Sequence, residues 1–134
     1  GCQVVVLSMQ GLTYMGNQAP ADVVLLQSGE ISVIINYLRH AKLFIGIGSG
    51  LSWLSWAMGC KTVLISGFSY PYTEVEDMIR IAANPEGCSG CFNRYPLDAG
   101  DWQWCPDYKN TPRMFECTRN ISAQQVIEVL SLHL

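Results

Sequence analysis

Four cysteines crowd one short stretch of this chain, and their spacing indicates its clearest chemistry. They are Cys88, Cys91, Cys105 and Cys117, in the pattern C-x2-C-x13-C-x11-C. Two residues between the first pair form the tight turn common in tetrahedral metal sites, and the later two cysteines return singly to complete four sulfur ligands. The pattern predicts one metal site. Because sulfur fills every position, none is left open for a substrate, and we expect a structural ion.

The alternative for these thiols is a pair of disulfides within the same loop. Disulfide scaffolds rarely carry the alternating strand and helix pattern found in the rest of the chain. That pattern, with Cys2 and Cys60 beside apolar runs, indicates a reducing compartment in which thiolates are free to bind a metal. We therefore favour the metal site. The residues alone favour zinc, although a sulfur tetrahedron also holds iron.

Length and composition are those of one globular domain. The chain has 134 residues, is 49% hydrophobic and carries a formal net charge of -3. This is enough sequence to bury a core. No cluster of Lys and Arg points to nucleic acid, and neither a run of about eighteen apolar residues nor a secretory signal points to a membrane. We predict a cytoplasmic protein that binds neither nucleic acid nor membrane.

Short apolar runs alternate with helical patterns along the first half of the chain. The runs predict buried parallel strands; they are Val4–Leu7, Val23–Leu26, Leu43–Ile47 and Thr62–Ser66. A polar loop from Gln10 to Pro20 separates the first two runs. Helices are expected between the later runs, at Ile31 to Leu38 and at about Leu51 to Met58. This order predicts an α/β fold with a doubly wound, Rossmann-like parallel sheet.

Regular periodicity is lost after Gly67 and returns only near the end of the chain. From Gly67 to about Asn120 the content of aromatic residues, Pro and Cys rises. Ser122 and Gln125 then form a capping box ahead of apolar residues, which predicts a final helix. We predict a single domain over 1–134, with a metal-binding finger inserted at 84–120 and a closing helix at 121–134.

A glycine-rich turn follows the third predicted strand and begins a helix. It comprises Gly48, Ser49, Gly50, Leu51 and Ser52. Glycines let a ligand approach the backbone N–H groups at a helix N-terminus, so an anion such as a diphosphate is expected there. The two serine hydroxyls could add donors. The same residues could also simply cap the helix, and the motif alone does not decide between the two.

Acidic residues follow the fourth predicted strand, at Glu74, Glu76 and Asp77. Ligand sites of α/β proteins gather at such positions, where a carboxylate could contact sugar or ribose hydroxyls. A solvated helix start is the interpretation we favour for them. No residue of the chain is assigned a catalytic role.

Five segments resemble the bacterial autotransporter heptosyltransferases. They are Phe44–Ala57, Ile65–Ser69, Cys88–Asn93, Asp101–Pro106 and Phe115–Thr118. The resemblance runs from about Ile34 to Val129. It implies that the chain is the carboxy-terminal part of a GT-B glycosyltransferase, a single partial nucleotide-sugar-binding domain. It also implies that the four cysteines hold iron, one ion per chain, in place of the zinc that the residues alone favour.

The same resemblance implies a reaction. Members of this family transfer heptose from ADP-heptose to serine hydroxyls of autotransporter adhesins, so the donor diphosphate would lie on Gly48 to Ser52. The broader lipopolysaccharide heptosyltransferases carry Asp-Thr-Gly and then His where this chain has Gly48-Ser49-Gly50 and Trp53. That departure removes a carboxylate that would contact the sugar. We also expect a homo-oligomer.

A GT-B enzyme needs two domains, and the acceptor-binding domain with its catalytic base has no counterpart in these residues. We therefore expect a fragment or truncated product that transfers little sugar by itself. The rival is a structural metal-ribbon module for protein interaction, in which Trp102 to Trp104 contact another chain. A nucleotide-sugar epimerase or synthase fragment is a weaker idea, because its Tyr/Lys or paired-acid group is not found. One observation distinguishes the first two hypotheses: the glycine turn after Ile47 either opens into a pocket or is filled by its own side chains.

Overall fold

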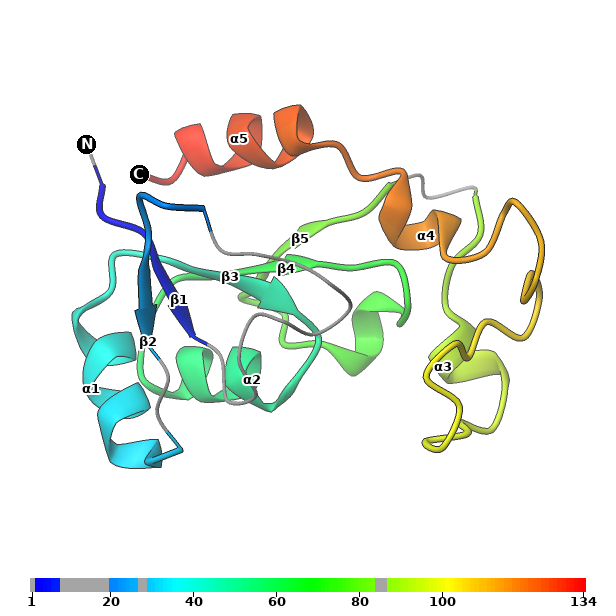
Figure 1. The fold of residues 1–134 in the computed structure, drawn as a ribbon, viewed down its shortest axis with the longest axis horizontal. Helices are drawn as coiled ribbons and strands as arrows, with labels where there is room; N and C mark the ends of the chain where they lie inside the picture. Colours follow the sequence, from blue (N-terminus) through cyan, green and yellow to red (C-terminus); the bar gives the residue numbers. More distant parts are fainter. Residues whose placement is uncertain (1, 8–19, 27–28, 84–86) are drawn as a thin grey trace.

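The computed structural model describes residues 2–7, 20–26, 29–83 and 87–134. The polar loop predicted from Gln10 to Pro20 lies outside these ranges, apart from Pro20 itself. Within them, strands and helices form an α/β body, and a segment poor in regular structure extends from one side of it (Figure 1). That segment carries the four clustered cysteines, and we call its described part, residues 87–120, the finger.

In the part of the chain that the structure describes, five strands form two parallel sheets. They are β1 (Val5–Leu7), β2 (Val24–Leu26), β3 (Phe44–Ile47), β4 (Thr62–Ile65) and β5 (Ile79–Ile81). β1 pairs with β2, with Val5 opposite Val24. The second sheet has the order β3-β4-β5, and all its neighbours are parallel. The predicted parallel α/β class is confirmed, and four of the five strands lie where short apolar runs predicted them.

Two features of the sheets differ from the sequence-based expectation. First, β2 and β3 belong to different sheets, although the order of elements suggested one doubly wound sheet. Second, β5 falls inside the segment that was expected to be irregular. This strand has only three residues, and Arg80 interrupts its apolar pattern. The arginine is tolerated because its guanidinium is paired with Glu74, Nε to Oε2 at 2.7 Å.

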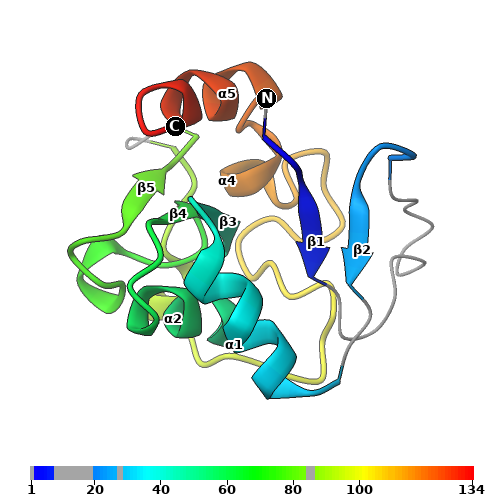
Figure 2. The same ribbon diagram turned by 90° about the vertical axis from the view of Figure 1, so that its left-hand side faces the viewer.

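Three longer helices flank the three-stranded sheet. α1 (Ile31–His40) and α2 (Gly50–Ala57) lie on one side of it, and α5 (Ala123–Ser131) lies on the other (Figure 2). The predicted capping box is half formed: the Ser122 hydroxyl accepts from the Gln125 amide at 3.1 Å. The Gln125 side chain instead donates to the Ala82 carbonyl at 3.0 Å, which ties α5 to the end of β5. Among the described residues, no helix has both the length and the apolar character needed to cross a membrane.

The core of the molecule is centred on β4. Val63 and Leu64 are 0% and 2% exposed, and Ile34 and Leu38 of α1 are each 2% exposed. Burial on both faces is what a central strand of a parallel sheet requires. The buried hydroxyl of Thr62 donates to that of Ser55 at 2.9 Å, so this polar pair is satisfied inside the core.

Candidate functional site

The turn between β3 and α2 carries the residues predicted to hold a diphosphate. Ser49 is the N-cap of α2, and its hydroxyl makes no capping hydrogen bond. The first N–H groups of a helix have no intrahelical acceptor, which leaves the amides of Gly50 and Leu51 available. A Cβ added at Gly48 or Gly50 would meet no atom within 4 Å. The space beside these two glycines is therefore not filled by other side chains.

Ser52 does not offer a hydroxyl at this turn. Its side chain is buried, with 1% exposed, and its Oγ donates to the Ile47 carbonyl at 2.5 Å. A Cβ added at Gly46 would lie 3.3 Å from the same Oγ and 2.8 Å from the Phe44 ring. Ser52 thus fastens the end of β3 to α2. Of the two hydroxyl donors that the sequence suggested, only that of Ser49 lies at the open turn.

All four clustered cysteines lie in the finger, but among the described residues the group of potential metal ligands within 4.8 Å of one another does not include Cys105 or Cys117. These two thiols lie near enough to Cys88 to raise its pKa through charge repulsion. All six cysteines of the chain are free thiols, so the disulfide alternative is not borne out. The sulfurs of Cys88 and Cys91 and a carboxylate oxygen of Asp107 lie within 4.8 Å of one another. Cys91 and Cys105 are 5% and 4% exposed. Cys88 and Cys117 are half-buried.

The thiols also act on one another electrostatically. Burial raises the pKa of the Cys88 thiol to about 11, and charge repulsion by Cys117, Cys91, Glu116 and Cys105 adds to this effect. Burial likewise raises the pKa values of Cys91 and Cys117. Thiolates held so close together need a cation to balance their charge, and soft sulfur donors suit zinc or iron. Cys88 and Cys91 are thus placed as a pair of metal ligands would be, whereas the predicted ligands Cys105 and Cys117 lie outside the 4.8 Å group.

Asp107 is a residue of this site that sequence reasoning did not select. It accepts a hydrogen bond from the Tyr95 hydroxyl at 2.6 Å and an ion pair from Arg94. The hydrogen bonds from Tyr95 and Arg94 lower the pKa of its carboxyl group, so it is ionised. The usable signal was its position two residues after Cys105, on the loop that bears a predicted ligand.

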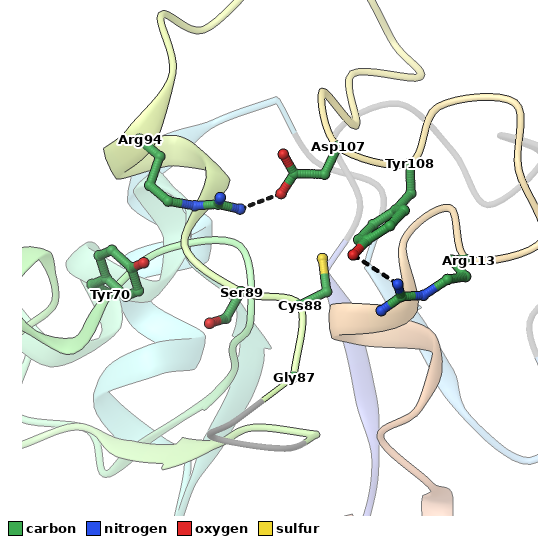
Figure 3. A pocket seen from close by; sticks show the side chains of 8 residues that line it. All are labelled: Tyr70, Gly87, Cys88, Ser89, Arg94, Asp107, Tyr108 and Arg113. Atoms are coloured by element: carbon green, nitrogen blue, oxygen red, sulfur yellow. Dashed lines mark hydrogen bonds and ion pairs between the residues drawn. The ribbon is translucent and has the colours of Figure 1, made fainter.

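A hollow of about 470 Å³ opens beside Cys88 (Figure 3). Its lining is polar and includes Arg94, Asp107, Tyr108 and Arg113. The Cys88 sulfur points toward the side on which Arg94 and Asp107 lie. Arg113 lies over the Tyr108 ring, 3.9 Å from its centroid, and donates to its hydroxyl at 2.7 Å. The sulfur cluster is therefore approached by solvent from the Cys88 side.

The finger is attached to the sheet through the loop that follows β4. The Gly90 amide donates to the Gly67 carbonyl at 2.9 Å, and the Phe92 amide donates to the Phe68 carbonyl at 3.1 Å. A Cβ added at Gly67 would lie 2.2 Å from the carbonyl oxygen of Cys117. Both cysteine-bearing ends of the finger thus contact one loop at the carboxyl end of β4, the edge of the sheet where α/β proteins bind ligands.

The favoured interpretation of Glu74, Glu76 and Asp77 as a solvated helix start is wrong for the helix and for Glu74, although Glu76 and Asp77 are exposed to solvent as expected. This segment follows a 3₁₀ turn, η2 (Pro71–Thr73), and no helix begins there. The Glu74 side chain is only 8% exposed. It accepts from the hydroxyls of Ser66 and Ser69 at 2.7 and 2.6 Å and pairs with Arg80. Its carboxylate holds the loop after β4 and is not presented to a sugar.

Three aromatic rings contact one another where the finger meets the loop after β4. The Phe68 ring lies 5.5 Å, centroid to centroid, from both Phe92 and Trp104. Trp102 is 77% exposed. Phe68, Phe92 and Trp104 thus contact one another, whereas Trp102 is exposed to solvent.

Curated relatives of this chain are autotransporter heptosyltransferases, whereas no family model matches it. The chain is 52% identical over 99 residues to autotransporter heptosyltransferase BAHTCr of Citrobacter rodentium, a match that covers 72% of this chain and 24% of the relative. It is 41% identical over 92 residues to BimC of Burkholderia thailandensis, described as an inactive autotransporter heptosyltransferase. This match covers 67% of this chain and 22% of BimC.

Two solved structures of TibC share the fold. One is described as a bacterial iron-containing dodecameric glycosyltransferase from enterotoxigenic E. coli; it has a TM-score of 0.87 and 39% identity, and covers 98% of this chain and 36% of its own. The other is described as a dodecameric iron-containing heptosyltransferase in complex with ADP-D-beta-D-heptose. It matches with a TM-score of 0.79 and 43% identity, over 87% of this chain and 31% of the TibC chain.

The extent of these matches defines what the chain represents. It spans 22% to 36% of the length of the proteins described above. The matches to the relatives cover at least 67% of this chain, and the structural match to TibC reaches 98% of it. Sequence identity and shared fold together show that this chain belongs with the bacterial autotransporter heptosyltransferases, as a part of their length.

Proposed function

We propose that this chain is the donor-binding part of a protein heptosyltransferase and that it holds ADP-heptose on Gly48 to Ser52. The observation that carries the proposal is the open glycine turn between β3 and α2, where no side chain fills the space above the backbone. The similar TibC structure with ADP-heptose supports the choice of donor. We further propose that the chain is a carboxy-terminal GT-B part, one partial domain with a finger insertion at 84–120 and a closing helix at 121–134.

The contribution of this part is binding and orientation. The free amides of Gly50 and Leu51 and the positive end of the α2 dipole would attract the diphosphate. Ser49 adds a hydroxyl, and Ser52 keeps the turn in shape through its bond to Ile47. These donors stabilise the negative charge that develops on the leaving nucleotide. The acceptor serine and the base that deprotonates it would be supplied by another domain, so direct inversion at the anomeric carbon requires that domain.

We propose that Cys88, Cys91, Cys105 and Cys117 hold one iron ion. The mutual repulsion of these thiols and the burial of Cys91 and Cys105 support this donor set. TibC, which shares the fold, is described as iron-containing. With four sulfur ligands the ion braces the finger and leaves no position for a substrate. Free thiols suit a reducing compartment, and we place the protein in the cytoplasm.

Thermal stabilisation by ADP and ADP-heptose tests the donor site. A ligand that binds only the folded state stabilises it by about 2.7 kcal/mol at a concentration of 100 Kd. We expect a concentration-dependent rise in Tm for the wild-type chain and no rise for Gly48→Val, whose side chain would occupy the open space. Gly29→Val is the matched control, because Gly29 also has no atom within 4 Å of an added Cβ and lies outside the turn.

Two outcomes would contradict the donor proposal. One is a folded wild-type sample that ADP-heptose does not stabilise, and the other is equal stabilisation of Gly48→Val. The purified chain should also transfer little or no heptose to an autotransporter passenger segment. Robust transfer would show that the missing base is not required. Elemental analysis tests the metal separately, with one iron per chain expected.

An assembly role is the second candidate function. Trp102 is 77% exposed on the finger, and the similar TibC structures are described as dodecameric. This role is compatible with donor binding, and we propose that the protein forms a homo-oligomer. Light scattering of the purified chain with Trp102→Ala as comparison measures it: a smaller assembly in the variant supports the role, and an unchanged mass argues against it.

A further inference from the structure

One cation in the finger contacts a predicted metal ligand directly. Arg94 ends the short helix α3 (Cys91–Arg94), three residues after Cys91, so both side chains lie on the same face of that turn. Its Nη2 lies 3.6 Å from the Cys91 sulfur and also donates to the Asp107 carboxylate. We propose that Arg94 is a positioning residue of the metal centre, which strengthens the retention of iron and raises its reduction potential. This inference rests on the proposed binding of iron by the four cysteines.

Arg94 is held in place by its neighbours. The Tyr95 hydroxyl donates to Oδ1 of Asp107 at 2.6 Å, which leaves Oδ2 for the guanidinium. The guanidinium also lies 5.1 Å from the centroid of the Tyr95 ring. A planar, multiply held guanidinium keeps its direction better than a free side chain would. The N–H group that faces Cys91 is therefore fixed relative to the sulfur.

The same contacts keep Asp107 from competing for the metal. One of its oxygens lies within 4.8 Å of the sulfurs of Cys88 and Cys91, a distance at which it could become a ligand. Tyr95 and Arg94 each engage one carboxylate oxygen. A carboxylate engaged in this way is a poorer ligand, so the site keeps its sulfur character. Sulfur ligation selects iron or zinc over harder cations.

Charge decides the direction of the effect on potential. Four thiolates around ferric iron give a net charge of about -1, and around ferrous iron about -2. A nearby positive charge and an N–H···S hydrogen bond stabilise the more negative, reduced form more strongly. Arg94 therefore raises the reduction potential, and its removal should lower it.

The experiment compares iron-loaded wild type with Arg94→Met, Arg94→Lys and Arg119→Met. Arg119 is the matched control: it ends the short helix α4 (Glu116–Arg119) two residues after Cys117, but its Nη1 donates to the Met114 carbonyl. Iron retention is measured by competition with a chelator, followed through the thiolate-to-iron absorption band. The midpoint potential is measured by redox titration of the same band.

Arg94→Met should hold iron about tenfold to a hundredfold more weakly, the usual loss when a hydrogen-bonding neighbour of a metal ligand is removed. Its potential should fall, by about 59 mV if ferrous affinity drops tenfold more than ferric affinity. Arg94→Lys keeps the positive charge but lacks the planar guanidinium. Its iron retention and midpoint potential should therefore lie between those of the wild type and of Arg94→Met. Arg119→Met should match the wild type in both measurements.

The outcomes separate this inference from the proposed function. A wild-type chain without bound iron removes the metal part of the proposed function. A wild-type chain that binds iron, with retention and potential unchanged in Arg94→Met, overturns only the role of Arg94. If circular dichroism shows that Arg94→Met is misfolded, Arg94→Lys carries the test, and an unchanged potential in that variant overturns the inference.

Discussion

The sheet and the finger of this molecule are stabilised by different means. In the sheet, the buried residues are mostly aliphatic, and they include Val63, Leu64 and Ile81 at 2% exposed or less. In the finger, residues 87–120, the buried residues are Gly90, Cys91 and Cys105. The finger has two buried thiols where the sheet has a packed aliphatic core. Apolar burial can hold the sheet, but it cannot hold the finger.

Ion pairs do not replace the aliphatic core that the finger lacks. Three of them lie on the finger, Arg94 with Asp107, Lys109 with Asp101, and Arg113 with Glu116. Their side chains are partly exposed to water, and exposed pairs contribute little to stability. We therefore expect the finger to depend on the proposed metal ion for its order, whereas the sheet should not.

Removal of the metal should have the largest effect, confined to one region. Structural metal sites contribute on the order of 10 kcal/mol to the folding of small domains that lack a core. In Cys105→Ser, we expect hydrogen exchange to become fast across 87–120 and to stay slow in β3 and β4. Cys2→Ser is the control, since Cys2 is exposed and distant in sequence from the cluster. Slow exchange in a metal-free finger would contradict the comparison.

A core truncation should have the opposite pattern. Leu64→Ala removes a side chain that is 2% exposed at the centre of the sheet. Such changes cost about 2–5 kcal/mol. Urea denaturation should show this loss, while the iron content per folded chain stays the same. Leu132→Ala, at a position 81% exposed, should leave the urea midpoint almost unchanged. Loss of iron in Leu64→Ala would mean that the two regions are not independent.

The contact between the regions should respond to one added methyl group. In Gly67→Ala, the new Cβ would lie 2.2 Å from the Cys117 carbonyl oxygen, so backbone has to move. Overpacking of this kind costs about 1–3 kcal/mol. We expect a lower Tm and an altered near-ultraviolet circular dichroism spectrum of the finger aromatics. Gly29→Ala, where the methyl meets nothing within 4 Å, should show neither change.

The smallest effect is expected at a surface ion pair. Lys109 lies 2.6 Å from Asp101, and its side chain is 42% exposed. Water and salt screen such a pair. Lys109→Met should leave Tm and iron retention unchanged within error in a thermal melt and a chelator competition. A clear loss of iron would show that the surface ion pairs contribute substantially to the stability of the finger.

The sheet could largely be predicted from the sequence because its signals are local. Continuous β-branched runs such as Thr62 to Ile65 mark buried strands, and the stripe from Ile31 to Leu38 marks a helix. β5 could not be predicted, since Arg80 breaks its pattern and is tolerated only through Glu74, a partner brought there by the fold. The placement of β2 and β3 in different sheets depends on which strands pair through hydrogen bonds, and local sequence patterns do not predict strand pairing.

The candidate sites were predictable to different depths. Cysteine spacing and the glycine turn predicted candidate ligand-binding residues, because ligand chemistry depends on residue type. The sequence could not reveal that the Ser52 hydroxyl is consumed by Ile47, or that Asp107 and Arg94 meet at Cys91. Such contacts depend on side-chain direction in three dimensions. For the same reason, Glu74 resembled a solvated acid and is a buried anchor.

The attachment of the finger at Gly67 has a consequence for how this family can vary. Gly90 and Cys117 both touch Gly67, so the chain leaves and re-enters the α/β body at nearly the same point. Insertions or deletions in between do not have to stretch or shift any strand. Each doubling of such a loop costs only about 0.6 kcal/mol in closure entropy. Homologues should therefore tolerate changes of length in the finger far more readily than in the connections between β3, β4 and β5.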